Sequence, residues 1–172
     1  MDTALVMFTE RGLSGVSVDQ VAEAAGYSRG AVYSNFDSKN DLALAIMEER
    51  MAMRASQLAD EIATNPDWWH PPEETADFTD PWDLLFVELL SEAMRDEEVR
   101  SRLADQLRDL TNAIGDGLVR AGFPSDRAQQ VAPVAIALIN GMQTQFLLTG
   151  DSHLFETYRE IMPGLIAGDE LG

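Results

Sequence analysis

Hydroxyl, guanidinium, phenol and ammonium groups gather between residues 17 and 39, in an order typical of two short helices joined by a turn. Ser17 and Gln20 form a capping-box pattern, in which the two side chains satisfy each other's backbone amides. Gly26 follows in the segment 25–28, where it predicts a tight turn at positive φ, and Ser28 is placed to cap the next helix. This pattern predicts helix-turn-helix geometry, with the second helix placed to enter a DNA major groove.

Arg29 is the side chain of the second helix best suited to reading a base, because a guanidinium can bind guanine bidentately for ~1–3 kcal/mol of discrimination. A phosphate contact by Arg29 is an equally open interpretation. Tyr33 is interpreted as a DNA contact, and Val32 and Phe36 as core residues. Ser17 and Ser28 are interpreted first as helix caps, with a phosphate contact as an additional role.

The elements that must position these side chains are all predicted to be helices, because the sequence shows no sustained strand alternation and no hairpin turn signal. Gly12, Gly26, Gly122 and Gly150 stand where helix C-terminal caps would fall. The first helix is predicted to end near residue 11. The others are predicted at 18–25, 29–35, 39–63, 81–95, 97–121, 126–149 and 152–167.

Two of the later helices carry apolar residues at intervals of three or four, which predicts one apolar face on each. The first stripe comprises Val99, Leu103, Leu107, Leu110, Ile114 and Leu118, and the second comprises Val131, Val134, Leu138, Ile139, Met142 and Phe146.

The charge balance opposes nucleic-acid binding at first sight. The 172 residues contain 12 basic and 30 acidic side chains, for a net charge of −18, and phosphate binding normally needs a basic face. Residues 1–47 hold three basic and six acidic side chains, a net charge of −3, so residues 48–172 hold the remaining −15. The acidity therefore lies mostly outside the predicted DNA-binding segment, where salt screens it over ~8–10 Å.

The sequence lacks the residues that metal binding, catalysis and membrane insertion would need. The chain has no cysteine, and His70 and His153 are not in a metal-binding spacing, so we expect no metal and no cofactor. No nucleophile motif or phosphate-binding glycine loop is present, so we expect no enzyme activity. No apolar run predicts a membrane span and no secretion signal is evident, so we expect a cytoplasmic protein that does not bind membranes.

The motifs at 8–12, 17–26 and 28–39 resemble the DNA-binding domain of the tetracycline-repressor (TetR) family of bacterial regulators. The glycine turn, Tyr33 with Phe36, and Ser38-Lys39 occur together at the spacing of that family. The resemblance implies an all-α fold, with a DNA-binding domain at 1–47 and a helical effector-binding and dimerisation domain at 48–172. It implies DNA contacts by Ser17, Ser28, Arg29, Gly30, Ala31, Tyr33, Ser34, Asn35 and Lys39.

The same resemblance implies two further partners of the C-terminal part, a second copy of the chain and a small-molecule effector. The last two long helices would form the dimer interface, with Leu138, Met142, Phe155, Tyr158 and Ile161 as candidates. An apolar or aromatic effector would bind Trp68, Trp69, Trp82, Phe86, Met94, Gln143 and Phe146. The alternative for most of these residues is packing within one subunit.

The resemblance therefore implies a ligand-responsive repressor that binds a palindromic operator on double-stranded DNA as a homodimer. Effector binding would move the long helix at 39–63 and change the separation of the two recognition helices. An activator or co-regulator of the same fold remains an alternative, as does a small-molecule binding protein that has lost operator binding. TetR-family members usually carry basic residues before the first helix. Here such an arm is either missing from the sequence or absent from the protein, and we expect modest affinity and steep salt dependence unless an arm is restored.

Overall fold

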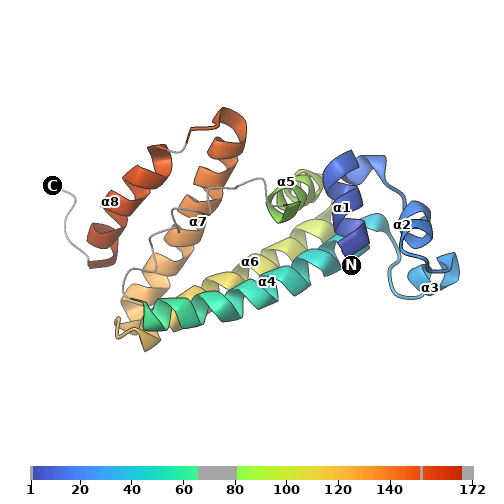
Figure 1. Ribbon diagram of the computed structural model, residues 1–172. Coiled ribbons are helices and arrows are strands. Elements are labelled where there is room, and N and C mark those ends of the chain that lie inside the picture. Colours follow the sequence, from blue (N-terminus) through green and yellow to red (C-terminus); the bar gives the residue numbers. More distant parts are fainter. Residues whose placement is uncertain (1, 66–80, 152, 168–172) are drawn as a thin grey trace. The chain divides into compact units, whose positions relative to one another are not determined.

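The computed structural model describes residues 2–65, 81–151 and 153–167, and every regular element in those ranges is helical (Figure 1). The elements are α1 (Asp2–Arg11), the 3-10 helix η1 (Leu13–Gly15), α2 (Val18–Ala24), α3 (Arg29–Tyr33), α4 (Lys39–Thr64), α5 (Pro81–Ala93), α6 (Glu97–Arg120), α7 (Ser125–Thr149) and α8 (His153–Ala167). The predicted all-α fold is confirmed, and each predicted helix ends within about two residues of the observed one.

Four glycines end helical segments in the manner that the sequence predicted. Gly12, Gly26, Gly122 and Gly150 all have positive φ, between 69° and 99°, a region that side chains with a Cβ rarely adopt. The sequence analysis missed η1, which follows Gly12. The Leu13 amide at its start donates to Glu88 Oε2 of α5 at 3.3 Å, so a long-range contact stabilises a turn too short to show periodicity.

The chain divides into two compact units, and the long helices α4 and α6 contribute to both. The N-terminal unit comprises residues 1–53 and 79–108, and the C-terminal unit comprises residues 54–78 and 109–172. This division describes compactness only. The functional division into 1–47 and 48–172 stays a prediction.

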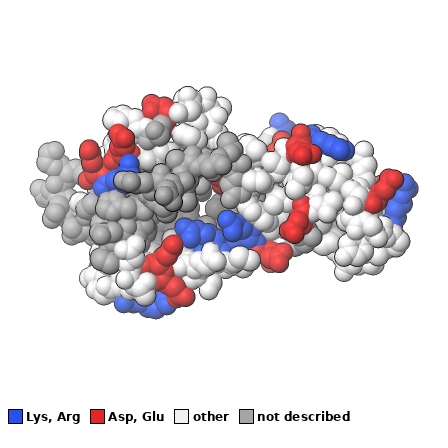
Figure 2. Space-filling view, in the orientation of Figure 1, with Lys and Arg blue, Asp and Glu red and all other residues white. Residues whose placement is uncertain are grey.

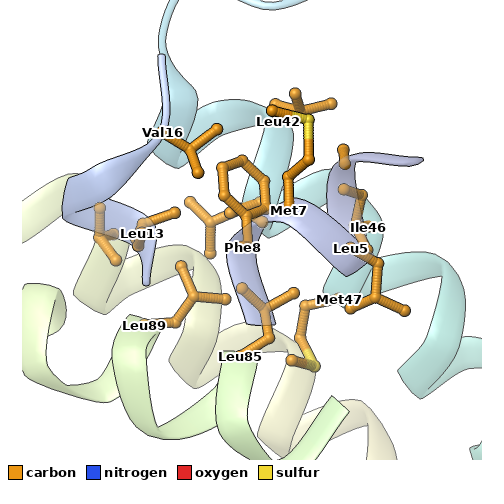
Figure 3. Close-up of a cluster of buried hydrophobic side chains, with 14 of the residues drawn as sticks. Leu5, Met7, Phe8, Leu13, Val16, Leu42, Ile46, Met47, Leu85 and Leu89 are labelled. Carbon is orange, nitrogen blue, oxygen red and sulfur yellow. The ribbon is translucent and has the colours of Figure 1, made fainter. Parts of the chain in front are cut away.

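Large apolar side chains fill the interior of the N-terminal unit (Figure 3). Phe8 of α1 is 2% exposed and lies among side chains from η1, α4 and α5, including Leu13, Leu42, Leu85 and Leu89. Phe36, which follows α3, packs partly buried against the same cluster. The helix-turn-helix segment is therefore attached to a core that α4 and α5 help to build.

Polar side chains of α6 hold the first half of α4 within this unit. Arg102 forms an ion pair with Asp41 and lies 3.9 Å from Glu48. Gln106 is buried, and its side-chain amide donates to the Leu44 carbonyl at 3.2 Å. Because a buried amide is costly without a partner, this bond helps to specify the pairing of α4 with α6.

Small residues bring helices close together in the C-terminal unit. A Cβ added at Gly117 of α6 would lie 2.9 Å from the Ala59 carbonyl oxygen of α4, so only glycine fits there without a shift. Ala128, Ala132 and Ala135 are three of the five buried residues of α7. The large residues in this core include Ile62, Ile114, Leu118, Met142, Phe155 and Tyr158.

The predicted apolar stripe of α6 is largely buried, whereas that of α7 is only partly buried within the chain. Val131 and Met142 are buried, but Val134 is 47% exposed and Leu138 is 37% exposed. The spacing places these residues on one broad side of α7, so one edge of that side is buried and the other edge is exposed. Helix α7 is also long and apolar enough to cross a membrane by length and composition alone, which a helix of a soluble protein can be too.

Candidate nucleic-acid interface

Local hydrogen bonds account for the turn between α2 and α3. The capping box is present as predicted: the Gln20 backbone amide donates to Ser17 Oγ at 3.3 Å, and the Ser17 backbone amide donates to Gln20 Oε1 at 2.9 Å. Gly26 has φ of +74°, and the Tyr27 amide donates to the Ala22 carbonyl at 2.9 Å. These contacts end α2 and redirect the chain into α3, as a helix-turn-helix requires.

Helix α3 has no buried residue, so its side chains are available to a partner. Arg29, Ala31 and Tyr33 are exposed, and a Cβ added at Gly30 would meet nothing within 4 Å. Val32, expected in the core, is half-buried. The position of α3 therefore depends on the turn at Gly26 and on the packing of Phe36, rather than on a buried face of its own.

The two capping serines differ in what they can offer a phosphate. The Ser17 hydroxyl already donates to the side-chain oxygen Oε1 of Gln20 at 3.2 Å, while its oxygen accepts a hydrogen bond from the Gln20 backbone amide. Ser28 Oγ accepts the Ala31 amide at 3.2 Å, and its own proton has no acceptor among the described residues. Ser28 can thus donate to a phosphate without losing a bond, whereas Ser17 must give one up.

Ser34 and Asn35 use their side-chain donors on the backbone of α3. Ser34 Oγ and Asn35 Nδ2 each donate to the Ala31 carbonyl at 2.9 Å, which satisfies an acceptor at the end of α3. The Tyr33 side chain is 48% exposed. Among these neighbouring residues, Tyr33 is the one whose polar group is not engaged within the part of the chain that is described.

Ser17, Tyr33 and Lys39, three of the residues predicted to contact DNA, line one open hollow of about 440 Å³. Lys39 is the first residue of α4, and Ser38 caps that helix by accepting the Asp41 amide at 3.0 Å. Asp41 Oδ2 in turn accepts the Asp37 amide at 3.1 Å. Hydroxyl, phenol and ammonium groups on this concave surface are suited to binding an anion such as a phosphate, but the acidic residue Asp37 lines the same hollow and opposes the charge of Lys39.

The structure adds two residues that the sequence analysis did not single out. Asp19 Oδ2 lies 3.1 Å from Nη1 of Arg29, so the arginine predicted to read DNA has an acidic neighbour. Tyr27, in the turn itself, is 67% exposed. Asp19 lies two positions after Ser17 and Tyr27 lies directly before Ser28, so their places near the capping serines were signals available in the sequence.

The view in Figure 2 shows basic and acidic groups side by side on the N-terminal unit, between larger areas that carry neither charge. A strongly basic surface does not appear on this face, in keeping with the net charge of −3 counted for residues 1–47. The described residues also hold no group of three or more His, Cys, Asp or Glu side chains that could bind a metal ion.

The residues predicted to bind an effector fall in both units. Trp82 and Phe86 pack partly buried against the N-terminal core, with the Arg50 guanidinium 5.5 Å from the Trp82 ring centre, and Met94 is 74% exposed. In the C-terminal unit, Gln143 is half-buried, and Phe146 makes an edge-to-face contact with Phe155 at 5.9 Å. Trp68 and Trp69 lie outside the described residues.

The residues predicted to form a dimer interface differ in exposure. Met142, Phe155 and Tyr158 are buried within one chain, and burial raises the pKa of Tyr158 to about 12. Leu138 and Ile161 are 37% and 42% exposed. These last two residues therefore have apolar surface free for contact with another chain.

Two family models match the sequence. Residues 1–46 match the model of bacterial regulatory proteins of the tetR family, and residues 75–168 match the tetracyclin repressor-like C-terminal domain. The chain belongs to the TetR family. As members of this family are DNA-binding transcriptional regulators, this TetR-family protein is one too.

Individual relatives agree with this assignment. The chain is 44% identical over 48 residues to the HTH-type transcriptional regulator AcrR of Shigella flexneri. This match covers 28% of this chain and 22% of AcrR. The chain is 28% identical over 158 residues to BetI of Rhizobium meliloti, covering 83% of this chain and 73% of BetI. A transcriptional regulator from Saccharomonospora viridis, solved in complex with choline, has the same fold, with a TM-score of 0.67, 17% identity, and coverage of 98% of this chain and 93% of that one.

Proposed function

We propose that this TetR-family protein is a repressor that binds a palindromic operator as a homodimer and is released by a small-molecule effector. The observation that carries the DNA-binding part is the convergence of Ser17, Tyr33 and Lys39 on one hollow, beside a helix α3 that buries none of its residues. Phosphates would contact the hollow and Ser28, while Arg29 and Ala31 would face base edges or the backbone. Gly30, Ser34 and Asn35 complete the proposed contact surface.

A dimer is required by the geometry of DNA, because a single small recognition helix binds weakly and two half-sites lie one helical turn, ~34–36 Å, apart. The exposed face of α7 supports this proposal. Val134, Leu138, Gly141 and Leu148 follow one another at intervals of four, three and seven, and all four are exposed. This spacing is typical of a helix seam that packs against another helix, with Gly141 allowing close approach.

Sedimentation equilibrium tests the proposed dimer. We expect Leu138→Glu to shift the protein toward monomer by at least tenfold in dissociation constant, because a buried leucine contributes about 1.5–3 kcal/mol and a charge opposes burial. Met53→Glu is the matched control, since Met53 is 50% exposed on α4 and lies outside the proposed seam. Equal effects of the two variants, or no effect of Leu138→Glu, would contradict the proposed interface.

The effector proposal rests on the family and on the supply of aromatic residues. The choline complex indicates that a protein of this fold can hold a small molecule, and the candidate residues here are Trp68, Trp69, Trp82, Phe86, Met94, Gln143 and Phe146. A screen for thermal stabilisation would find ligands, and each one would then be added to the DNA complex. A ligand that stabilises the protein and leaves operator affinity unchanged contradicts effector release.

Fluorescence anisotropy tests the function as a whole, with DNA from upstream of the protein's own gene and a scrambled duplex of equal length. We expect sequence-dependent binding that Arg29→Ala weakens, by about 5- to 150-fold if Arg29 reads a base. Arg108→Ala is the matched control, because it removes one exposed positive charge from α6 of the same unit. Equal, weak binding to both duplexes by all three proteins would favour a small-molecule binding protein without an operator.

A further inference from the structure

The pair formed by Asp19 and Arg29 joins the two helices of the helix-turn-helix across their turn. Asp19 is the second residue of α2, and Arg29 is the first residue of α3. Asp19 Oδ2 lies 3.1 Å from Arg29 Nη1, and the Arg29 side chain is 73% exposed while that of Asp19 is 35% exposed. The acid is thus the more firmly seated partner, and the arginine reaches outward from it.

Two features of the carboxylate support this reading. Asp19 Oδ1 is buried and has no hydrogen-bond partner among the described residues, so this oxygen is packed against the protein while the rest of the side chain is partly exposed. Its other oxygen engages one terminal nitrogen of Arg29. A guanidinium carries five N–H donors in a fixed plane, so Nε and Nη2 keep donors for a second partner.

We propose that Asp19 is a positioning residue that orients the Arg29 guanidinium for a base edge and thereby raises the preference of the protein for operator over other DNA. A long arginine side chain loses rotamer freedom when it binds, and an ion pair formed beforehand reduces that loss. The proposal rests on the proposed function, in which α3 reads a specific DNA sequence.

The same carboxylate disfavours indiscriminate binding. An arginine paired with an acid has less net charge to offer a phosphate, and the acid itself repels the backbone. If Arg29 only contacts phosphates, removal of Asp19 strengthens binding to all DNA alike. If Asp19 orients Arg29 for a base, its removal weakens operator binding while binding to other DNA stays equal or rises. The two readings therefore predict opposite changes in selectivity.

The experiment measures selectivity, defined as the ratio of affinities for a duplex that the protein itself selects from a random pool and for a scrambled duplex of equal length. We expect Asp19→Asn to lower this ratio by about tenfold, within the range known for one oriented arginine contact. Glu23→Gln is the matched control, because it removes one negative charge from an exposed site of the same helix, α2. We expect it to change both affinities equally and leave the ratio intact.

A double-mutant cycle identifies the route of the effect. On an Arg29→Ala background, Asp19→Asn has no arginine left to release, so we expect no further loss of selectivity. Asp19→Glu keeps the charge and should retain more selectivity than Asp19→Asn. The slope of log affinity against log salt on scrambled DNA should steepen by up to about one in Asp19→Asn, as the freed arginine gains a phosphate.

Each result decides between the inference and the proposed function. If Arg29→Ala lowers the ratio but Asp19→Asn leaves it unchanged or raises it, the role of Asp19 is overturned and the DNA-reading function stands. If the pool yields no preferred sequence, the proposed function itself fails. Thermal unfolding of each variant separates these results from a folding defect, and a loss of selectivity equal in Asp19→Glu and Asp19→Asn at unchanged midpoints also overturns the proposal.

Discussion

The N-terminal and C-terminal units are both helical but fill their interiors in different ways. The N-terminal unit packs large side chains around Phe8, with Leu13, Leu85 and Leu89 almost fully buried. The C-terminal unit relies more on small residues, with Gly117 against the Ala59 backbone and three alanines on the buried face of α7. Large apolar residues of α7, such as Val134, Leu138 and Leu148, remain exposed there.

Both units leave some large apolar side chains exposed, such as Met94 in the N-terminal unit and Leu148 in the C-terminal unit, so the difference lies in the surfaces that α3 and α7 present. In the N-terminal unit, the helix α3 presents the Arg29 guanidinium and the Tyr33 phenol to solvent, groups that can bind the phosphates and bases of DNA. In the C-terminal unit, alanine and glycine make close helix contacts, and larger apolar side chains of α7 such as Leu138 and Leu148 stay exposed. An exposed apolar stripe of this kind suits a protein partner.

The largest expected effect is a cavity in the N-terminal core. We expect Phe8→Ala to lower the free energy of unfolding by about 3–5 kcal/mol, because packed neighbours cannot close the space that the ring leaves. Val6→Ala, on the same helix but 49% exposed, should cost less than about 1 kcal/mol. Urea unfolding measures both, and similar losses in the two variants would contradict a core centred on Phe8.

The second effect concerns a buried phenol in the C-terminal unit. The pKa of Tyr158 is raised to about 12 by burial, while an unfolded tyrosine titrates near 10, so the folded state retains the proton longer. Stability should be full below pH 10 and should fall by roughly 2–3 kcal/mol as the pH rises through 12.

Tyr158→Phe should remove this part of the alkaline loss. It should also leave neutral-pH stability equal or slightly higher, since the Tyr158 hydroxyl has no hydrogen-bond partner among the described residues. Tyr27→Phe is the control, because it removes a phenol that is 67% exposed instead of a buried one. Urea unfolding at pH 8 to 12 measures how stability depends on pH. The same dependence in Tyr158→Phe as in the unmodified protein would contradict the role of Tyr158 in the alkaline loss of stability.

The third effect compares two Gly→Ala substitutions in α6, one at a crowded position and one with space for a methyl group. Gly117→Ala should destabilise the protein by about 1–2 kcal/mol, because the new methyl group must displace the α4 backbone. Gly115→Ala, two residues away, should stabilise it by up to about 1 kcal/mol, since its methyl group would meet only Ala132 at an ordinary 3.9 Å. Thermal unfolding should show a lower melting temperature for Gly117→Ala and a higher one for Gly115→Ala. An unchanged melting temperature in Gly117→Ala would contradict the close packing of α6 against α4.

The smallest effect is local to the helix-turn-helix. Ser17→Ala should cost about 1 kcal/mol, because it removes the cap that accepts the Gln20 amide. Ser14→Ala is the control, as Ser14 is an exposed residue of η1. Urea unfolding again distinguishes them, and equal losses would mean that the capping box does not stabilise α2.

The sequence by itself determined the local structure. Helix ends follow from serine caps and glycine stops, whose effects act within about four residues, and so the ends near Arg11, Ser28 and Gly150 could be predicted. The spacing of Ser17, Gly26, Tyr33 and Lys39 was likewise sufficient to identify a helix-turn-helix and its family. The capping box is wholly local, and it formed as predicted.

Only the tertiary structure decided which side chains meet. The pairing of Asp19 with Arg29 and that of Asp41 with Arg102 depend on how helices are oriented, which periodicity does not encode. The sequence pattern could not show which apolar residues of α7 are buried and which are exposed, because both sets follow the same spacing. Packing in one core with Ile114 and Leu118 decides which of them are buried. The close approach of Gly117 to Ala59 likewise joins residues 58 positions apart, and such long-range packing is set by the whole fold.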